Sequence, residues 1–282
     1  MSKIRIAING FGRIGRAVFK VLRERGDCEV VAINDLADNE TVAYLLKHDS
    51  VYGVYGRSVT YDQAGIAVDG QVVRVLSEAR PDKLPWDGMD IDVVVEATGK
   101  FTSTDRARDH IHAGAKKVVV TAALHDDGSY VILGANDDAI KTAGEVVSMG
   151  SCTANAVLPL LKIINDSFKV KSAFITNIHS YTNDQSLHDS AGGGSLRGRR
   201  GIENIIPIGS NVAKIVQQIL PDIETIESSG YRIPLQAAAL VELTAVLHEP
   251  VDSDTLRKTL VEATSQPYYR GIVSMTNEQL VS

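Results

Sequence analysis

A glycine pattern near the start of the chain restricts the local fold more than any other feature. Gly10, Gly12 and Gly15 have G-x-G-x-x-G spacing, after an apolar segment (3–9) that predicts a strand and at the start of a segment (13–24) that predicts a helix. In a βαβ unit the first glycine makes the tight turn, the second admits a pyrophosphate close to the backbone, and the third lets the helix pack on the strand. Backbone N–H groups at the start of that helix then face the phosphates. The pattern therefore predicts a nucleotide-binding unit.

An acidic residue at the end of the second predicted strand strengthens this prediction. Asp35 follows the strand 29–34 and lies about 20 residues after Gly15, where the acid that binds the ribose is expected. A carboxylate accepts hydrogen bonds from ribose hydroxyls but repels a 2′-phosphate, so NAD is expected in preference to NADP. The alternative is a common glycine-rich turn in which Asp35 only caps the strand end.

Strand and helix signals alternate through the first half of the chain, which is typical of a parallel sheet with crossover connections. Strands are expected at 92–96, 117–121 and 130–134, with a helix at 104–113. After Cys152 the pattern changes to a long helix, 156–166, then a strand, 173–179, and further strands within 231–250. We expect an α/β fold with a Rossmann-type doubly wound nucleotide domain at 1–150, followed by an α+β catalytic domain at 151–282.

Composition argues against several classes of partner. The chain has 282 residues, 44% of them hydrophobic, and a net charge of −6, so no broad basic face for nucleic acid is expected. No apolar stretch approaches the roughly 20 residues that span a bilayer, and the first residues do not resemble a signal peptide. The two cysteines, Cys28 and Cys152, favour a reducing compartment over a disulfide framework. We expect a cytoplasmic protein with no nucleic-acid partner, no membrane partner and no metal site.

Cys152 has the sequence context of a nucleophile. It lies in Ser-Cys-Thr-Ala-Asn (151–155), directly before the apolar segment 156–164, which predicts a helix. Partial positive charge collects at a helix N-terminus and favours thiolate over thiol. Because the thiolate is the reactive form of cysteine, the sequence predicts covalent chemistry at Cys152 coupled to a dinucleotide.

Several segments in fixed order resemble one family, the phosphorylating glyceraldehyde-3-phosphate dehydrogenases. The opening Ile-Asn-Gly-Phe-Gly-Arg-Ile-Gly-Arg (8–16) resembles the start of that family, and the catalytic half matches at Ser-Cys-Thr (151–153) and His-Ser-Tyr-Thr-Asn-Asp-Gln (179–185). The remaining matches are at 45–53, 96–102, 113–118 and 204–207. The resemblance implies a homotetramer that oxidises and phosphorylates an aldehyde phosphate with NAD and inorganic phosphate as partners, most specifically D-glyceraldehyde 3-phosphate to 1,3-bisphosphoglycerate in glycolysis.

The resemblance also implies a role for His179. Cys152 would attack the aldehyde to give a hemithioacetal, and His179 would activate the thiol and take the hydroxyl proton as hydride leaves. Inorganic phosphate would then cleave the resulting thioester. From the residues alone, a lone histidine at a strand end is more often a satisfied polar residue than a base.

The same resemblance implies which residues bind the cofactor and the two phosphates. The cofactor set is Gly10, Phe11, Gly12, Arg13, Ile14, Gly15, Asp35, Arg80, Thr98, Gly99, Phe101 and Thr121. The substrate phosphate is expected at Thr182, Asp184 and Arg232, and inorganic phosphate at Ser151, Thr153, Ser210 and Asn211. A simpler alternative is that the hydroxyls cap helices and Arg232 makes a surface ion pair. A Gly/Arg-rich loop (190–201) contains Arg197, Arg199 and Arg200. It resembles the family's loop that contacts the cofactor and neighbouring subunits, and the alternative is a solvated basic loop.

Some positions depart from the family pattern. Asn211 replaces the usual glycine beside the phosphate site, and Ser190 and Ala191 replace a Leu-Pro pair that helps exclude a 2′-phosphate, so selectivity for NAD is expected to be looser. The family pattern continues past residue 282, so the catalytic domain is expected to lack its C-terminal part. Two alternatives therefore stay open, an erythrose-4-phosphate dehydrogenase and a NAD-binding pseudoenzyme or regulatory protein.

Overall fold

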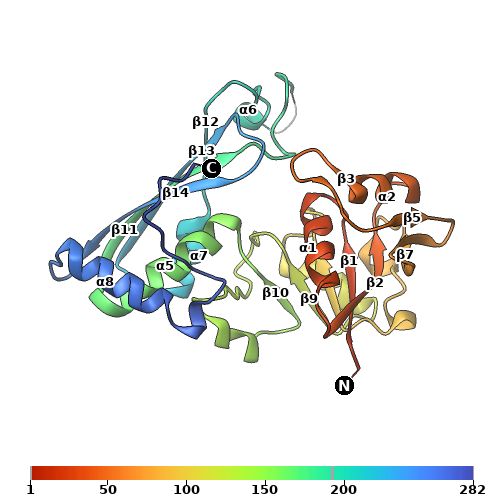
Figure 1. The fold of residues 1–282 in the computed structure, drawn as a ribbon, viewed down its shortest axis with the longest axis horizontal. Helices are drawn as coiled ribbons and strands as arrows, with labels where there is room; N and C mark the ends of the chain where they lie inside the picture. The colour runs from red at the N-terminus through yellow and green to blue at the C-terminus, as the bar shows by residue number, and fades with distance from the viewer. Residues whose placement is uncertain (1, 192–193, 282) are drawn as a thin grey trace. The chain divides into compact units, whose positions relative to one another are not determined.

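The computed structural model describes residues 2–191 and 194–281, and Figure 1 shows its fold. The contacts divide the chain into two units, one formed by Met1–Tyr130 with Ile140–Gly150 and the other by Val131–Ala139 with Ser151–Ser282. The second unit therefore includes a short segment, Val131–Ala139, that lies before the expected boundary at residue 150. In the described part of the chain no helix is long and apolar enough to cross a membrane.

The first unit is built on an eight-stranded sheet with the order β10-β9-β8-β1-β2-β7-β6-β5. Six neighbouring strands are parallel: β10 Val146–Ser148, β9 Lys117–Val120, β8 Val93–Glu96, β1 Ile4–Asn9, β2 Cys28–Asn34 and β7 Gln71–Leu76. Antiparallel β6 Gly65–Val68 and β5 Val59–Tyr61 continue the sheet past β7, and a small hairpin pairs β3 His48–Asp49 with β4 Gly53–Val54. Helices α1 Arg13–Arg23, α2 Asn39–Lys47, α3 Thr104–Ala107 and α4 Asp109–His112 lie between the strands in sequence.

The strand order creates a switch point beside β1. The chain leaves β1 for β2 on one side and returns to pair β8 on the other. In open α/β sheets ligands bind at such a point, outside the carboxyl ends of the strands. Helix α1 is fixed to the sheet there because Phe19 is fully buried in a core with Ile8, Ile33 and Leu46, and its ring meets that of Phe11 edge-on at 5.6 Å.

The second unit has a mixed four-stranded sheet with the order β12-β13-β11-β14. Its strands are β11 Val170–Ser180, β12 Ile206–Ile208, β13 Thr225–Ile233 and β14 Ala239–Leu247, and its helices are α5 Cys152–Phe168, α6 Gly194–Arg197, α7 Val212–Ile219 and α8 Ser253–Thr264. β11 pairs parallel with β13 and antiparallel with β14. Helices α5 and α7 pack against this sheet (Figure 1), so the unit has the α+β composition expected from the sequence.

The expected strand at 130–134 is wrong. Only an isolated bridge forms there, between Tyr130 and Ser148. The amide of Ile132 donates to Asn136 Oδ1 and that of Gly134 to Asp137 Oδ2, so a following turn takes the hydrogen bonds that a strand would need. The helix expected at 104–113 is also divided in two at Arg108, and the short strand β12 was missed in the polar region before α7.

The remaining short elements are 3-10 helices. They are η1 Pro81–Lys83, η2 Asp87–Met89, η3 Asp137–Lys141 and η4 Pro267–Tyr269.

Candidate active site and nucleotide site

Cys152 is the first residue of α5, and the residue before it caps the helix. Ser151 Oγ accepts a hydrogen bond from the Ala154 amide at 3.1 Å, which satisfies one of the free amides of the first turn. The helix runs for 17 residues, so its positive end lies at the cysteine. The thiol is exposed, whereas Cys28, the other free cysteine, is buried. The helix begins earlier than the sequence predicted, and its first position is the predicted nucleophile.

His179 contacts this thiol. Its Nε2 lies 3.1 Å from Cys152 Sγ, although the two residues lie on different elements, α5 and β11. The interaction with His179 lowers the pKa of the Cys152 thiol, against the opposing effect of burial. The same contact raises the pKa of His179, again against burial. Both shifts favour transfer of the proton from sulfur to imidazole, so the pair has the properties of a thiolate and an imidazolium.

The other side of the imidazole ring is held by the sheet. His179 Nδ1 lies 2.6 Å from the carbonyl oxygen of Ser180, which can accept a hydrogen carried on that nitrogen. Arg232, directly opposite His179 in the parallel register of β11 and β13, donates to the same carbonyl at 3.1 Å and places Nη1 2.6 Å from Nδ1. Its positive charge lowers the pKa of His179 and so partly offsets the effect of the thiol. Nε2 is the ring nitrogen that faces Cys152 Sγ.

A loop after β11 carries the other residues expected at the substrate phosphate. Thr182 Oγ1 donates to Asp184 Oδ1, and the other oxygen of Asp184 pairs with Arg197 of α6. Gln185 is buried and donates from Nε2 to the carbonyl oxygens of Leu196, Arg197 and Arg199, which fixes the Gly/Arg-rich loop. This role of Gln185 was missed, because a glutamine in a polar segment has no distinguishing sequence signal. Residues 192 and 193 of the loop lie outside the described residues.

The residues expected at inorganic phosphate fall into two groups. Ser151 caps α5 and Thr153 is buried in its first turn. Ser210 Oγ accepts from the Val212 amide at 3.4 Å, and Asn211 is the N-cap residue of α7 but makes no side-chain cap. Among the described residues no hydrogen bond joins one group to the other.

The three glycines of the G-x-G-x-x-G motif differ in whether the fold leaves space for a side chain. Gly10 has φ of +91°, and a Cβ there would meet the Thr98 amide nitrogen at 2.7 Å. A Cβ on Gly15 would lie 2.1 Å from the Gly10 carbonyl oxygen. A Cβ on Gly12, by contrast, would meet nothing within 4 Å, and its φ is −68°. The fold therefore requires Gly10 and Gly15, while Gly12 leaves a space that suits the close approach of a ligand.

Asp35 forms part of the glycine turn. Its Oδ2 accepts a hydrogen bond from the Phe11 amide at 2.7 Å, and its Oδ1 accepts from the Ala37 amide at 3.0 Å. Each carboxylate oxygen retains a further acceptor position for a ribose hydroxyl. The acid thus holds the turn and can also bind a ribose.

Most of the other expected cofactor residues follow strand ends of the same sheet. Thr98 and Gly99 follow β8, and Thr121 follows β9 and donates its hydroxyl to the Glu96 carbonyl at 3.1 Å. Phe101 packs under the Arg106 guanidinium at 4.9 Å, and Arg80 lies past β7 in an exposed ion pair with Asp82. In the first turn of α1, Arg13 and Ile14 are exposed, whereas the Phe11 ring is buried in the core. Across the described residues no group of three or more metal-ligating side chains could hold an ion.

Comparison with known proteins shows which family the chain belongs to. The family model for the glyceraldehyde 3-phosphate dehydrogenase NAD binding domain matches residues 4–104, and the model for its C-terminal domain matches residues 151–282. The chain belongs to the glyceraldehyde-3-phosphate dehydrogenase family. The matched N-terminal model is that of a NAD-binding domain, and it contains the glycine turn, Asp35 and the turn after β8.

Individual members of the glyceraldehyde-3-phosphate dehydrogenase family are similar over almost the whole chain. The enzyme of Borreliella burgdorferi is 39% identical, in an alignment that covers 99% of this chain and 85% of the relative. Glyceraldehyde-3-phosphate dehydrogenase 1 of Bacillus subtilis is 38% identical, with 99% and 84% covered. The enzyme of Escherichia fergusonii is 40% identical, with the same two shares.

Proposed function

We propose that this protein oxidises and phosphorylates an aldehyde phosphate with NAD, converting D-glyceraldehyde 3-phosphate to 1,3-bisphosphoglycerate. The observation that carries the proposal is the 3.1 Å contact between Cys152 Sγ and His179 Nε2 at the start of α5. It supplies a nucleophile and an adjacent base in a family whose N-terminal domain binds NAD. The family membership supports the further proposal that this reaction is a step of glycolysis.

The reaction starts from the ion pair. The Cys152 thiolate attacks the aldehyde carbon, and the carbonyl oxygen takes a proton from His179 Nε2–H and becomes the hydroxyl of the hemithioacetal. His179 then removes that hydroxyl proton as the C–H bond breaks and the carbonyl re-forms, which leaves a thioester on Cys152. Bound NAD supplies the hydride acceptor for this step. An oxygen of inorganic phosphate attacks the thioester carbon, the C–S bond breaks, and the acyl phosphate leaves Cys152 as a thiolate again.

We assign the substrate phosphate to Arg232 and Thr182. Burial, and after it the charge of Arg197, lowers the pKa of Arg232, so an anion beside these two arginines would be favoured. The negative charge of Asp184 would repel phosphate, so we assign it a different role. It accepts a hydrogen bond from the Thr182 hydroxyl and would orient that hydroxyl toward the phosphate. Ser151, Thr153, Ser210 and Asn211 remain our proposal for inorganic phosphate, supported by the positive N-termini of α5 and α7.

We assign the cofactor to the carboxyl ends of the strands around β1. Gly12 leaves room for the pyrophosphate, Asp35 faces the ribose hydroxyls, and the turn Thr98–Gly99 forms the opposite wall. The remaining contacts are proposed for Gly10, Phe11, Arg13, Ile14, Gly15, Arg80, Phe101 and Thr121. The charge of Asp35 supports a preference for NAD over NADP.

We also propose that the protein is a cytoplasmic homotetramer. Two unpaired cysteines support a reducing compartment. One face of the second unit's sheet exposes Phe174, Leu240 and Val246, which lie on the same side of β11 and β14, while α5 and α7 pack against this sheet. Exposed apolar side chains on a sheet face are typical of surfaces that bury against another subunit.

Steady-state assays test this function. NADH formation would be followed with D-glyceraldehyde 3-phosphate and with erythrose 4-phosphate, each with and without inorganic phosphate. We expect phosphate-dependent turnover with a higher kcat/KM for glyceraldehyde 3-phosphate. A higher kcat/KM for erythrose 4-phosphate would change the substrate, and NAD binding without turnover would show a pseudoenzyme.

A further inference from the structure

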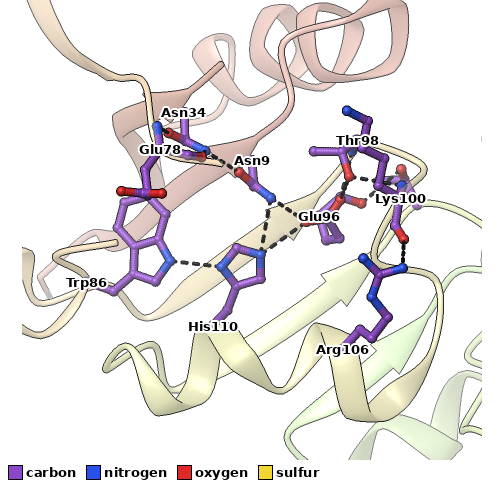
Figure 2. Close-up of polar contacts among 10 residues, drawn as sticks. Asn9, Asn34, Glu78, Trp86, Glu96, Thr98, Lys100, Arg106 and His110 are labelled. Carbon is purple, nitrogen blue, oxygen red and sulfur yellow. Dashed lines mark hydrogen bonds and ion pairs between the residues drawn. The ribbon is translucent and has the colours of Figure 1, made fainter. Parts of the chain in front are cut away.

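A buried carboxylate contacts the Thr98–Gly99 turn of the proposed cofactor site, and it has no part in the proposed mechanism. Glu96 ends β8 and is 1% exposed. Its Oε1 accepts from the Thr98 amide at 2.8 Å and from the Thr98 hydroxyl, and its Oε2 accepts from Asn9 Nδ2 and from His110 Nε2 at 3.1 Å (Figure 2). Four donors therefore converge on two oxygens, an arrangement that occupies the acceptor positions of a carboxylate.

The histidine in this cluster contributes a hydrogen but no charge. Trp86 Nε1 donates to His110 Nδ1 at 3.0 Å, and an indole N–H can only donate, so Nδ1 is unprotonated. Nε2 then carries the single ring hydrogen and gives it to Glu96. Both His110 and Trp86 are fully buried. Within the described residues no lysine or arginine pairs with Glu96, so neutral donors alone satisfy its charge.

The cluster extends across the sheet to β2. Asn9 Oδ1 accepts from Asn34 Nδ2 at 2.7 Å, and Asn34 in turn holds both the amide and the carbonyl of Glu78 at 2.8 Å. Asn9, Asn34 and Glu96 are the last residues of β1, β2 and β8. Each directly precedes a turn assigned to the cofactor, at Gly10, at Asp35 and at Thr98. Figure 2 shows this continuous chain of polar contacts.

The two walls of the cofactor site also touch each other. The space where Gly10 would carry a Cβ is filled by the Thr98 backbone, with its amide nitrogen only 2.7 Å away. That amide is the group held by Glu96 Oε1. On the outer side of the turn, the Lys100 amide donates to Thr98 Oγ1 at 3.0 Å and Arg106 holds the Lys100 carbonyl at 2.9 Å. A change at Glu96 would therefore move both the glycine turn and the Thr98–Gly99 turn.

We propose that Glu96 is a positioning residue for the cofactor: its buried carboxylate, satisfied by Asn9, His110 and Thr98, sets the spacing between the glycine turn and the Thr98–Gly99 turn. The proposal rests on the proposed cofactor site. It predicts that loss of the carboxylate weakens NAD binding in protein that is still folded.

The experiment measures the NAD dissociation constant by titration calorimetry, together with Tm, in the full chain. Glu96→Gln keeps the size of the side chain but turns its NH₂ group toward existing donors. We expect the dissociation constant for NAD to rise by about tenfold, as expected for buried donors left without an acceptor. Val118→Ala is the matched control, because it removes volume at a fully buried residue of the neighbouring strand β9, and Val118 makes none of the hydrogen bonds of the cluster. It should lower Tm and leave the dissociation constant within about twofold of the wild-type value.

Two histidine variants give a second, milder test in case Glu96→Gln does not fold. His110→Phe removes one donor from Glu96 and should weaken NAD binding. His110→Gln can still donate to Glu96 through its amide and should bind NAD more tightly than His110→Phe. Equal NAD affinities for these two variants and the wild type would overturn the proposal. It would also be overturned if Glu96→Gln and Val118→Ala lost NAD affinity in the same proportion to their loss of Tm.

A Gly12→Val variant separates this inference from the proposed function. A Cβ at this position has no protein atom within 4 Å, so the variant should fold and lose NAD binding. If Gly12→Val loses binding while Glu96→Gln binds like the wild type, Glu96 has no positioning role but the cofactor site stands. If Gly12→Val binds NAD like the wild type, the proposed cofactor site itself is wrong and the inference falls with it.

Discussion

At the scale of single residues, the chemistry depends on where one proton lies. Ser151 fixes the start of α5, the helix presents Cys152, and the sheet holds His179 within 3.1 Å of the sulfur. The Ser180 carbonyl holds Nδ1 and leaves Nε2 to face the thiol. The positive charge of Arg232 lowers the pKa of His179. An anion bound at Arg232 would offset that charge and make the imidazolium of His179 easier to form.

The lowered pKa of Cys152 and the raised pKa of His179 predict the pH dependence of thiol reactivity. A lowered thiol pKa means that thiolate persists below the usual range of about 8.5, so Cys152 should react with iodoacetamide at lower pH than Cys28. His179→Asn removes the partner and should move that profile to higher pH. It should also lower kcat by about 10²–10⁴ and leave NAD affinity unchanged. An unchanged alkylation profile in the variant would show that the two side chains do not share a proton.

Asp35 has two tasks that different substitutions separate. Asp35→Asn removes the negative charge but keeps an oxygen that can accept from the Phe11 amide, whereas Asp35→Ala removes both. We expect Asp35→Asn to improve kcat/KM for NADP because repulsion of the 2′-phosphate is lost. Asp35→Ala should in addition weaken binding of both cofactors, because the glycine turn loses its anchor. Comparison of kcat/KM for the two cofactors checks this, and a wild type that uses both equally would show that Asp35 does not reach the ribose.

At the scale of elements, the turn between β1 and α1 leaves space for a side chain at Gly12 but not at Gly15. Gly15→Ala places a methyl group 2.1 Å from the Gly10 carbonyl and should destabilise the protein by about 3 kcal/mol or more. Gly12→Ala has free space and should change stability by less than about 1 kcal/mol. Urea unfolding of the two variants measures the difference. Equal losses of stability would mean that the turn is not held as the structure shows.

The sequence predicted elements best where a local signal agreed with packing. The helix expected at 13–24 forms as α1 Arg13–Arg23, and the strand expected at 117–121 forms as β9 Lys117–Val120. The segment 130–134 was predicted wrongly because its apolar residues are buried in an irregular turn that packs with the second unit. Short apolar runs do not distinguish a strand from such a turn.

At the scale of the whole molecule, local sequence patterns point to single candidate residues and not to the contacts between them. The glycine motif, Asp35 and Cys152 each have a local signal, whereas Asn9, Glu96 and His110 meet only because two strands and a helix far apart in sequence become neighbours. In the sequence, Glu96 is the polar end of the apolar run 93–95 and the start of the matched segment 96–102, and neither feature indicates a buried carboxylate with these partners. Pairing between distant strands is not encoded in any local pattern, so the buried cluster could not be predicted.

The proposed tetramer can be tested on the exposed sheet face of the second unit. Replacing Phe174 and Val246 with glutamate places charge on side chains that are 45% and 53% exposed. Because these positions have room for a charge in one chain, the subunit should fold, but association should be lost. Light scattering after size exclusion gives the mass, with Val72→Glu, an exposed position of the first unit, as control. A wild type that is monomeric at all concentrations would contradict the tetramer.

The chemistry proposed for Cys152 has one direct measurement. The protein would be mixed with D-glyceraldehyde 3-phosphate and NAD without inorganic phosphate, quenched in acid, and digested for mass spectrometry. We expect a burst of NADH and a 3-phosphoglyceryl thioester on the peptide that contains Cys152, which disappears when phosphate is added. A burst without acylation of Cys152, or the same burst from Cys152→Ala, would contradict the proposed mechanism.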